Sequence, residues 1–136
     1  MPDDTKTFVL LKPDAVRRRL VGEIVGRFEA KGLVVEKLEM ITVSPELAEK
    51  HYGEHKGKPF YQPLVDFITG GPSVALCLSG PSVVPVVRKM MGATKFTDAE
   101  AGTIRGDYAH DLTENLVHGS DSPESAEREL KLFFGN

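Results

Sequence analysis

The apolar residues of this chain occur in blocks, and the spacing within each block predicts the element that it forms. Continuous apolar runs predict buried strands at 7–12 (TFVLLK) and 73–80 (SVALCLSG), and a brief strand at 116–118 (LVH). A fourth strand is predicted over 33–43 (LVVEKLEMITV), which is rich in β-branched residues. There a two-residue period places Val34, Leu38 and Met40 on one face, with Lys37 and Glu39 on the other.

Between the strands, apolar residues recur at helical spacing. The clearest segment is 21–28, which is followed by the helix-end signal Lys31-Gly32. A serine directly before a proline is typical of a helix start, with Ser as the N-cap and Pro as the first helical residue. Start and end signals predict further helices from Ser44, over about 60–69, from Ser82 to Gly92, and from Ser122.

Residues 93–114 have little period, and we expect an ordered loop whose length suggests a function. The predicted order is βα, β, a helical pair, β, α, loop, β, α. Two βαβ-like halves with four strands indicate an α/β (α+β) ferredoxin-like sandwich forming a single domain over 1–136. Its sheet would be mostly antiparallel with helices on one face, and the helical hairpin and the long loop would be insertions.

Charge and cysteine content narrow the function classes. The chain has 17 Lys and Arg against 20 Asp and Glu, so its net charge is 17 − 20 = −3, which argues against nucleic acid as the main partner. A local basic pocket for a small anion remains compatible with this charge. The one cysteine, Cys77, lies in an apolar run and indicates a core residue in a reducing compartment.

The start of the chain, MPDDTKTFVLLKP, is acidic and has only a four-residue apolar run, unlike a signal peptide or a membrane anchor. No run approaches the roughly 20 apolar residues of a membrane span. We therefore expect no membrane partner and a cytoplasmic location.

Common phosphate-binding loops are absent. The chain contains neither GxxxxGK[ST] nor GxGxxG. Lys12, Arg88 and Arg105 could instead form a polyphosphate pocket if the fold brings them together, since Arg offers a bidentate fork and Lys a point charge. Taken singly, a residue of this kind is more often a solvated or ion-paired surface charge.

The histidines suggest different chemistries. His51, His55 and His118 are too scattered along the chain to suggest a metal site. His51 and His55 are four residues apart, but HYGEH contains a glycine and lacks the HExxH order of a zinc site. His118, in NLVHGSD, is either a structural histidine or a reactive one. Gly119 beside it permits close approach of a ligand, and a buried Glu129 could fix the imidazole tautomer and leave the other nitrogen free to attack.

Two aromatic residues flank a Lys- and Gly-rich stretch. Tyr52 and Phe60 could both be packing residues. Alternatively, an exposed Phe60 could stack on a nucleobase, and the Tyr52 hydroxyl could reach a phosphate.

Several stretches together resemble the nucleoside diphosphate kinase family. They are TFVLLKPDAVRR, HYGEHKGKPFY, GPSVALCLSG, VRKMMGAT, GTIRGDYA and NLVHGSDSPESAERELKLFF. The likeness extends from about residue 5 to residue 134, and NxxHGSD followed by an SxEsAxxEI-like helix is the hallmark of that family.

The resemblance implies ping-pong transfer of the γ-phosphoryl group from a nucleoside triphosphate, mainly ATP, to a nucleoside diphosphate, which maintains NTP and dNTP pools. His118 would take the phosphoryl group on Nδ1, and Glu129 would hold the imidazole through its other nitrogen. Lys12 and Tyr52 would contact the phosphoryl group, and Lys12 also the ribose. The other implied roles are Arg88, Thr94 and Arg105 for the β and γ phosphates, Asn115 for the ribose 3′-hydroxyl, Phe60 and Leu112 for the two sides of the base, Ser120 for a hydrogen bond near Glu129, and Asp121 for Mg²⁺ through water.

Some positions differ from the common family pattern. The usual glycine after KPD is Ala15, two loop prolines are Phe96 and Ala101, and a tryptophan of the last helix is Phe133. Family members use this loop in assembly, so its changes bear on subunit contacts. The resemblance implies a homo-oligomer, with a hexamer favoured over a tetramer.

Two other function classes are weighed against the kinase. A ferredoxin-like binding module that has lost its chemistry would be expected to lack part of the set of site residues, but the set is complete. A protein kinase would need a Gly-rich loop and an HRD motif, which the sequence lacks.

Overall fold

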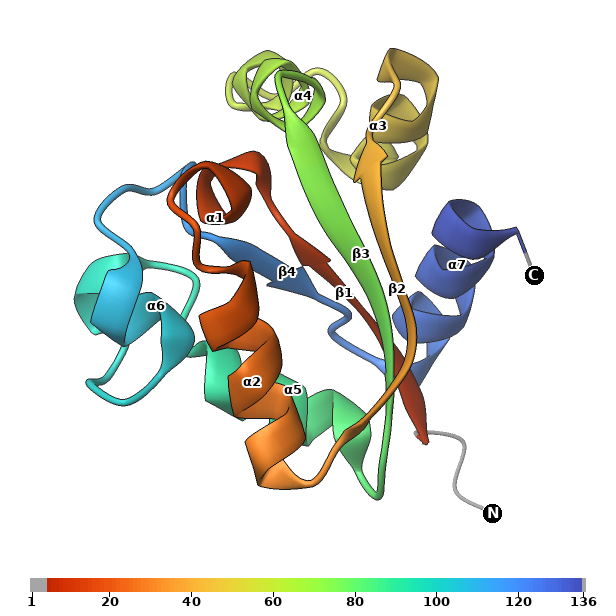
Figure 1. The fold of residues 1–136 in the computed structure, drawn as a ribbon. Coiled ribbons are helices and arrows are strands. Elements are labelled where there is room, and N and C mark those ends of the chain that lie inside the picture. Colours follow the sequence, from red (N-terminus) through yellow and green to blue (C-terminus); the bar gives the residue numbers. More distant parts are fainter. Residues whose placement is uncertain (1–4, 136) are drawn as a thin grey trace.

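The fold is a four-stranded sheet with helices on both faces, seen in a computed structural model that describes residues 5–135 (Figure 1). The strand order is β2-β3-β1-β4, and all three pairings are antiparallel. The elements in chain order are β1 (Lys6–Leu11), α1 (Pro13–Arg17), α2 (Val21–Lys31), β2 (Val34–Thr42), α3 (Pro45–His51), the 3₁₀ turn η1 (Gly53–His55), α4 (Tyr61–Thr69), β3 (Pro72–Ser79), α5 (Val83–Met91), the 3₁₀ turn η2 (Phe96–Asp98), α6 (Ile104–Tyr108), β4 (Val117–Gly119) and α7 (Pro123–Phe134).

The central strands are buried on both sides, which explains why their sequences are continuously apolar. In β1, Val9 and Leu11 point into one core, with α2 and α5, while Phe8 and Leu10 point into the other. The second core contains residues of α3, α4 and α7, and Figure 1 shows α7 across the sheet from α2 and α5. The prediction that helices cover one face was therefore wrong, although the ferredoxin-like class is confirmed.

The faces predicted for the side chains of β2 were wrong, because the strand contains a bulge. The register shifts between Val35 and Lys37, so that Val34 lies across from Ser79 while Leu38 and Met40 lie across from Leu76 and Val74. Cross-strand partners share a face. Val34 is thus on the face opposite to Leu38 and Met40, and all three side chains are at least half exposed, at 55%, 50% and 61%.

Two of the three predicted serine caps form. Ser44 and Ser122 accept hydrogen bonds from the backbone N–H groups of Leu47 and Ser125, both at 3.1 Å. Ser82 lies at the start of α5, but its φ of 51° is left-handed and its side chain makes no cap. That prediction was wrong because the chain enters α5 by a tight turn after β3.

Short helices account for the remaining differences. The predicted loop 93–114 contains η2 and the five-residue α6, whose N-cap Thr103 accepts from the Gly106 N–H at 2.9 Å. Pro13 is the first residue of α1, not merely the end of a strand. Helices this short have no detectable period and depend on tertiary contacts.

The predictions about a signal peptide and a membrane anchor concern the acidic start of the chain. Residues 1–4, which carry that acidic start, lie outside the described residues. Within residues 5–135, no helix has the length and apolar character that a bilayer crossing requires.

We expect Gly106→Ala to lower the free energy of unfolding by about 1–3 kcal/mol, because a Cβ at this position would overlap the backbone carbonyl of Glu100, which cannot rotate away. Gly26→Ala on the exposed side of α2 is the matched control: no atom lies within 4 Å of its Cβ, and it should stabilise the helix by about 0.5–1 kcal/mol. Urea denaturation measures both, and equal effects of the two substitutions would contradict the prediction.

Candidate active site

One cavity of about 440 Å³ opens between β4, α5, the helical hairpin α3–α4 and the long loop. It gathers residues that are up to 117 positions apart, from Lys12 to Glu129. Of the predicted site residues, all but Ser120 line it: Lys12, Tyr52, Phe60, Arg88, Thr94, Arg105, Leu112, Asn115, His118, Gly119, Asp121 and Glu129.

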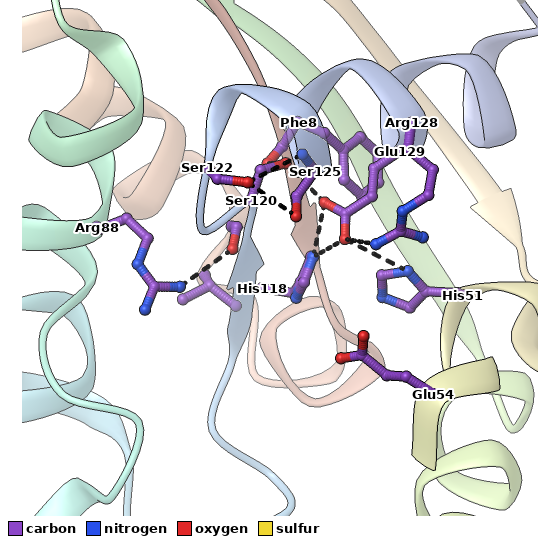
Figure 2. A network of polar contacts seen from close by, with 12 residues as sticks. Phe8, His51, Glu54, Arg88, His118, Ser120, Ser122, Ser125, Arg128 and Glu129 are labelled. Carbon is purple, nitrogen blue, oxygen red and sulfur yellow. Dashed lines mark hydrogen bonds and ion pairs between the residues drawn. The ribbon is translucent and has the colours of Figure 1, made fainter. Parts of the chain in front are cut away.

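The centre of the cavity is a hydrogen-bonded pair between β4 and α7. His118 lies across from Leu10 of β1, and its Nε2 is 3.0 Å from both carboxylate oxygens of Glu129 (Figure 2). Ser120 donates from its hydroxyl to Oε1 of the same carboxylate at 2.6 Å. With Nε2 as the nitrogen that donates to Glu129, the lone pair of His118 is on Nδ1.

Glu129 is only 3% exposed, so its charge needs compensation. Burial alone would raise the pKa of this carboxyl. The hydrogen bond and the charge of His118, with the hydrogen bond from Ser120, outweigh burial, and the pKa lies below its ordinary value. The carboxylate is therefore ionised and fixes the orientation of the imidazole.

His51 is a member of this cluster that the sequence did not identify, since its distance from His118 along the chain suggested no common site. It ends α3, and its ring is perpendicular to that of His118 at a centroid distance of 4.6 Å. Burial lowers its pKa to about 3, and the neighbouring His118 acts in the same direction. At neutral pH, His51 is therefore uncharged, and its 3.9 Å approach to Glu129 is not an ion pair.

Donor atoms of His51, His118 and Glu129 lie within 4.8 Å of one another, close enough to be considered as metal ligands. The surroundings argue against a bare cation there. Arg128 Nη2 is 3.7 Å from the Glu129 carboxylate, and further basic side chains line the same cavity.

Three cations, Lys12, Arg88 and Arg105, line the same cavity. Lys12 donates from Nζ to Asn115 Oδ1 at 2.9 Å, and burial together with Arg105 lowers its pKa to about 8. Arg105 donates to the carbonyls of Gly92 and Val117 at 2.9 and 2.7 Å, and burial together with Arg88 lowers its pKa to about 10. Cations that depress one another's pKa in this way leave a site suited to a multiply charged anion.

Apolar and aromatic residues form the outer part. Phe60 and Leu112 are exposed, at 47% and 62%, and both line the cavity. Tyr52 is buried below them, and burial together with the Glu129 charge raises its pKa to about 12, so its hydroxyl remains a hydrogen-bond donor. An exposed ring and the buried cations Lys12 and Arg105 in one cavity match an aromatic group carrying phosphates.

Three further polar residues line the cavity: the buried Asn115 and the exposed Thr94 and Asp121. Asn115 donates from Nδ2 to the Leu112 carbonyl at 3.1 Å, which fixes its amide. Asp121 is exposed, and a hydrogen bond from Ser125 lowers its pKa. An ionised, exposed carboxylate of this kind could hold a hard cation such as Mg²⁺.

The structure gives another explanation for the glycine at position 119 than the close approach of a ligand that the sequence suggested. A Cβ at this position would lie 2.6 Å from the methyl carbon of Met91 in α5. The glycine thus leaves room for the end of the Met91 side chain beneath the cavity, and a larger residue would make that side chain move. Glu54 and Arg128 also line the cavity without having been predicted, because a charged residue on a solvated helix carries no signal in one sequence.

Comparisons with known proteins agree with this geometry. A family model described as nucleoside diphosphate kinase matches residues 5–136. A nucleoside diphosphate kinase of Thermus thermophilus is 58% identical over 129 residues, covering 95% of this chain and 94% of the relative. One of Rubrobacter xylanophilus is 58% identical over 130 residues, covering 96% and 98%.

Solved structures give the same result. A halophilic nucleoside diphosphate kinase from Halobacterium salinarum in complex with CDP superposes with a TM-score of 0.95 at 49% identity, covering 98% of this chain and 89% of that one. The apo enzyme from Encephalitozoon cuniculi has a TM-score of 0.95 at 39% identity, covering 97% and 90%. With a matching family model over nearly the whole chain and relatives above half identity, this chain belongs to the nucleoside diphosphate kinase family.

Proposed function

We propose that the chain transfers the γ-phosphoryl group of a nucleoside triphosphate, mainly ATP, to a nucleoside diphosphate through a phosphohistidine on His118. The observation that carries the proposal is the pair of 3.0 Å contacts between His118 Nε2 and the buried Glu129 carboxylate, beside three cations in one cavity. The nucleotide of the Halobacterium salinarum complex, CDP, supports a nucleoside diphosphate as the ligand of this chain.

The first half-reaction makes a P–N bond at Nδ1 and breaks the bond between the γ-phosphorus and its bridging oxygen, releasing the diphosphate. The proton on Nε2 stays in the hydrogen bond to Glu129, which stabilises the positive charge that develops on the ring. The second half-reaction reverses these bond changes with another diphosphate as the acceptor. The overall transfer thus takes place in two chemically equivalent steps, each through a loose transition state.

Binding is divided along the cavity. Arg88, Thr94 and Arg105 hold the β and γ phosphates, and Lys12 and Tyr52 contact the phosphoryl group in transit. Asn115 binds the ribose 3′-hydroxyl. Phe60 and Leu112 hold the base by its faces, without reading its hydrogen-bonding edges, which favours several bases equally.

Mg²⁺ fits the residues present. Asp121 is an ionised, exposed carboxylate on the cavity rim, and Mg²⁺ is commonly held by one carboxylate, water and substrate phosphates. When bound, the ion would neutralise charge on the phosphates.

Ser120 is the remaining residue of the predicted site. Its hydroxyl donates a hydrogen bond to the Glu129 carboxylate and helps to orient it.

We expect purified wild-type protein with γ-labelled ATP and Mg²⁺ to acquire an acid-labile label, and GDP to remove it as labelled GTP. His118→Ala should lose the label entirely, because His51, the other imidazole beside Glu129, is buried and has no hydrogen-bond partner within residues 5–135 to orient it. His110→Ala is the matched control, since this exposed histidine is outside the cavity and should leave labelling unchanged. A folded wild type that never takes label would refute the proposal.

An uncharged His51 next to the nucleophile keeps a competing positive charge away from His118. Its pKa of about 3 in the folded state lies below the ordinary 6.5, so the unfolded chain binds more protons between these values. Stability from this residue is therefore complete above pH 6.5 and is lost as the pH falls toward 3.

Between pH 7 and pH 5, the wild type should lose about 2 kcal/mol more of its free energy of unfolding than His51→Phe, which cannot titrate. Urea denaturation of both proteins at several pH values measures the difference. Parallel pH profiles would show that His51 accepts a proton in the folded protein, contrary to this expectation.

We further propose a homo-oligomer, with a hexamer favoured over a tetramer by the family resemblance. The proposal of an oligomer is supported by β2, which is an edge strand of the sheet and has large exposed apolar side chains, including Leu38 and Met40. Such an edge associates readily with another chain. Free, buried Cys77 supports the further proposal of a cytoplasmic location.

Replacing both Leu38 and Met40 with Lys should shift the particle mass from a multiple of 14.9 kDa toward the single-chain value. The charges would oppose burial of this edge. Light scattering after size exclusion measures the mass, and Glu49→Lys on the exposed side of α3 controls for added charge. An unchanged assembly in the double variant would exclude this face of β2 as an interface.

A further inference from the structure

Asp14 is a fully buried carboxylate without a role in the proposed phosphoryl transfer. It lies in the first turn of α1, two residues after Lys12. Oδ2 accepts a hydrogen bond from the backbone N–H of Leu116 at 3.1 Å, while Oδ1 has no hydrogen-bond partner within residues 5–135. Burying a carboxylate is unfavourable unless something is gained, so the contact with Leu116 calls for an explanation.

Leu116 has a backbone conformation that leucine rarely adopts. Its φ is 78°, and the Val117 N–H donates to the Asn115 carbonyl at 2.9 Å across it. A hydrogen bond between residues two apart, with a positive φ at the central residue, defines the strained form of the γ-turn. The Leu116 side chain is fully buried, so the turn is anchored in the core.

Both main-chain polar groups of Leu116 are held by the segment that carries Lys12. The Leu116 carbonyl accepts from the Lys12 N–H at 2.8 Å, and its N–H donates to Asp14. Strained backbone persists only where its surroundings over-determine it. These two bonds are that restraint, one to the carbonyl and one to the N–H of Leu116.

The turn lies between two residues of the site. On one side, Asn115 accepts from Lys12 Nζ at 2.9 Å; on the other, the chain enters β4 and reaches His118. If Leu116 relaxed to an ordinary negative φ, the chain direction before β4 would change, and Asn115 and His118 would move relative to Lys12.

We propose that Asp14 is a positioning residue for phosphoryl transfer: its carboxylate holds Leu116 in the strained turn and so fixes Asn115 and His118 relative to Lys12. The inference rests on the proposed function, in which these three residues take part. Asp14 acts through the turn and does not touch the nucleotide, and what the turn requires of it is a hydrogen-bond acceptor, not its charge.

The test compares phosphoenzyme formation from γ-labelled ATP in wild type, Asp14→Ala, Asp14→Asn and Ile24→Ala. At saturating ATP, the rate for Asp14→Ala should fall about 10- to 100-fold, since a small misplacement of reacting groups has effects of this size. Asp14→Asn keeps an acceptor oxygen and should stay within about threefold of wild type. Ile24→Ala, in the buried face of α2 and outside the cavity, is a control that loses stability and keeps the wild-type rate.

Two kinetic outcomes would overturn the proposal. A folded Asp14→Ala that labels as fast as Ile24→Ala would remove any positioning role. An Asp14→Asn as slow as Asp14→Ala would show that the charge beside Lys12 matters and not the acceptor. Failure of the wild type itself to take label would refute the proposed function, which is a separate result.

A measurement on the wild type covers the case in which Asp14→Ala does not fold. The Leu116 amide has Asp14 as its acceptor, so its hydrogen exchange reports on this contact when compared with an amide of the same sheet. We expect its exchange to be as slow as that of Leu10 in β1. Exchange at an unprotected rate, while Leu10 stays protected, would mean that the restraint is not maintained in solution.

Discussion

The hydrogen bond between the buried Glu129 carboxylate and His118 is the contact on which the site depends. A carboxylate that is 3% exposed is tolerable only with partners, and it finds them in His118 and Ser120, both in or next to β4. Glu129 reaches them because Leu130 and Phe133 pack α7 against the second core. The packing of α7 against the second core therefore also positions the carboxylate that orients His118.

The sheet makes this arrangement rigid. Lys12 follows β1 directly, and His118 lies in the adjacent β4 across from Leu10. Because β1 is buried on both faces, neither strand can shift without disturbing two cores.

The sequence predicted the parts whose signal is local. Continuous apolar runs identified β1 and β3, and the serines at 44 and 122 identified helix starts. The faces of β2 were misassigned because one bulge reverses the period, and α1 and α6 were missed because five residues have no period to detect. Most site residues came from the family motifs; His51 escaped because its importance lies in a tertiary contact with His118 that no spacing encodes.

The depressed pKa of Lys12 has a consequence for proton balance. With a value of about 8, an appreciable fraction of the free protein carries a neutral Lys12 in mildly alkaline solution. A polyphosphate beside it would favour the ammonium form, so nucleotide binding at such pH takes a proton from the buffer. The apparent affinity for nucleotide then falls as the pH rises, and the heat of binding depends on the ionisation enthalpy of the buffer. Burial of one lysine thereby couples the nucleotide equilibrium to the acidity of the medium.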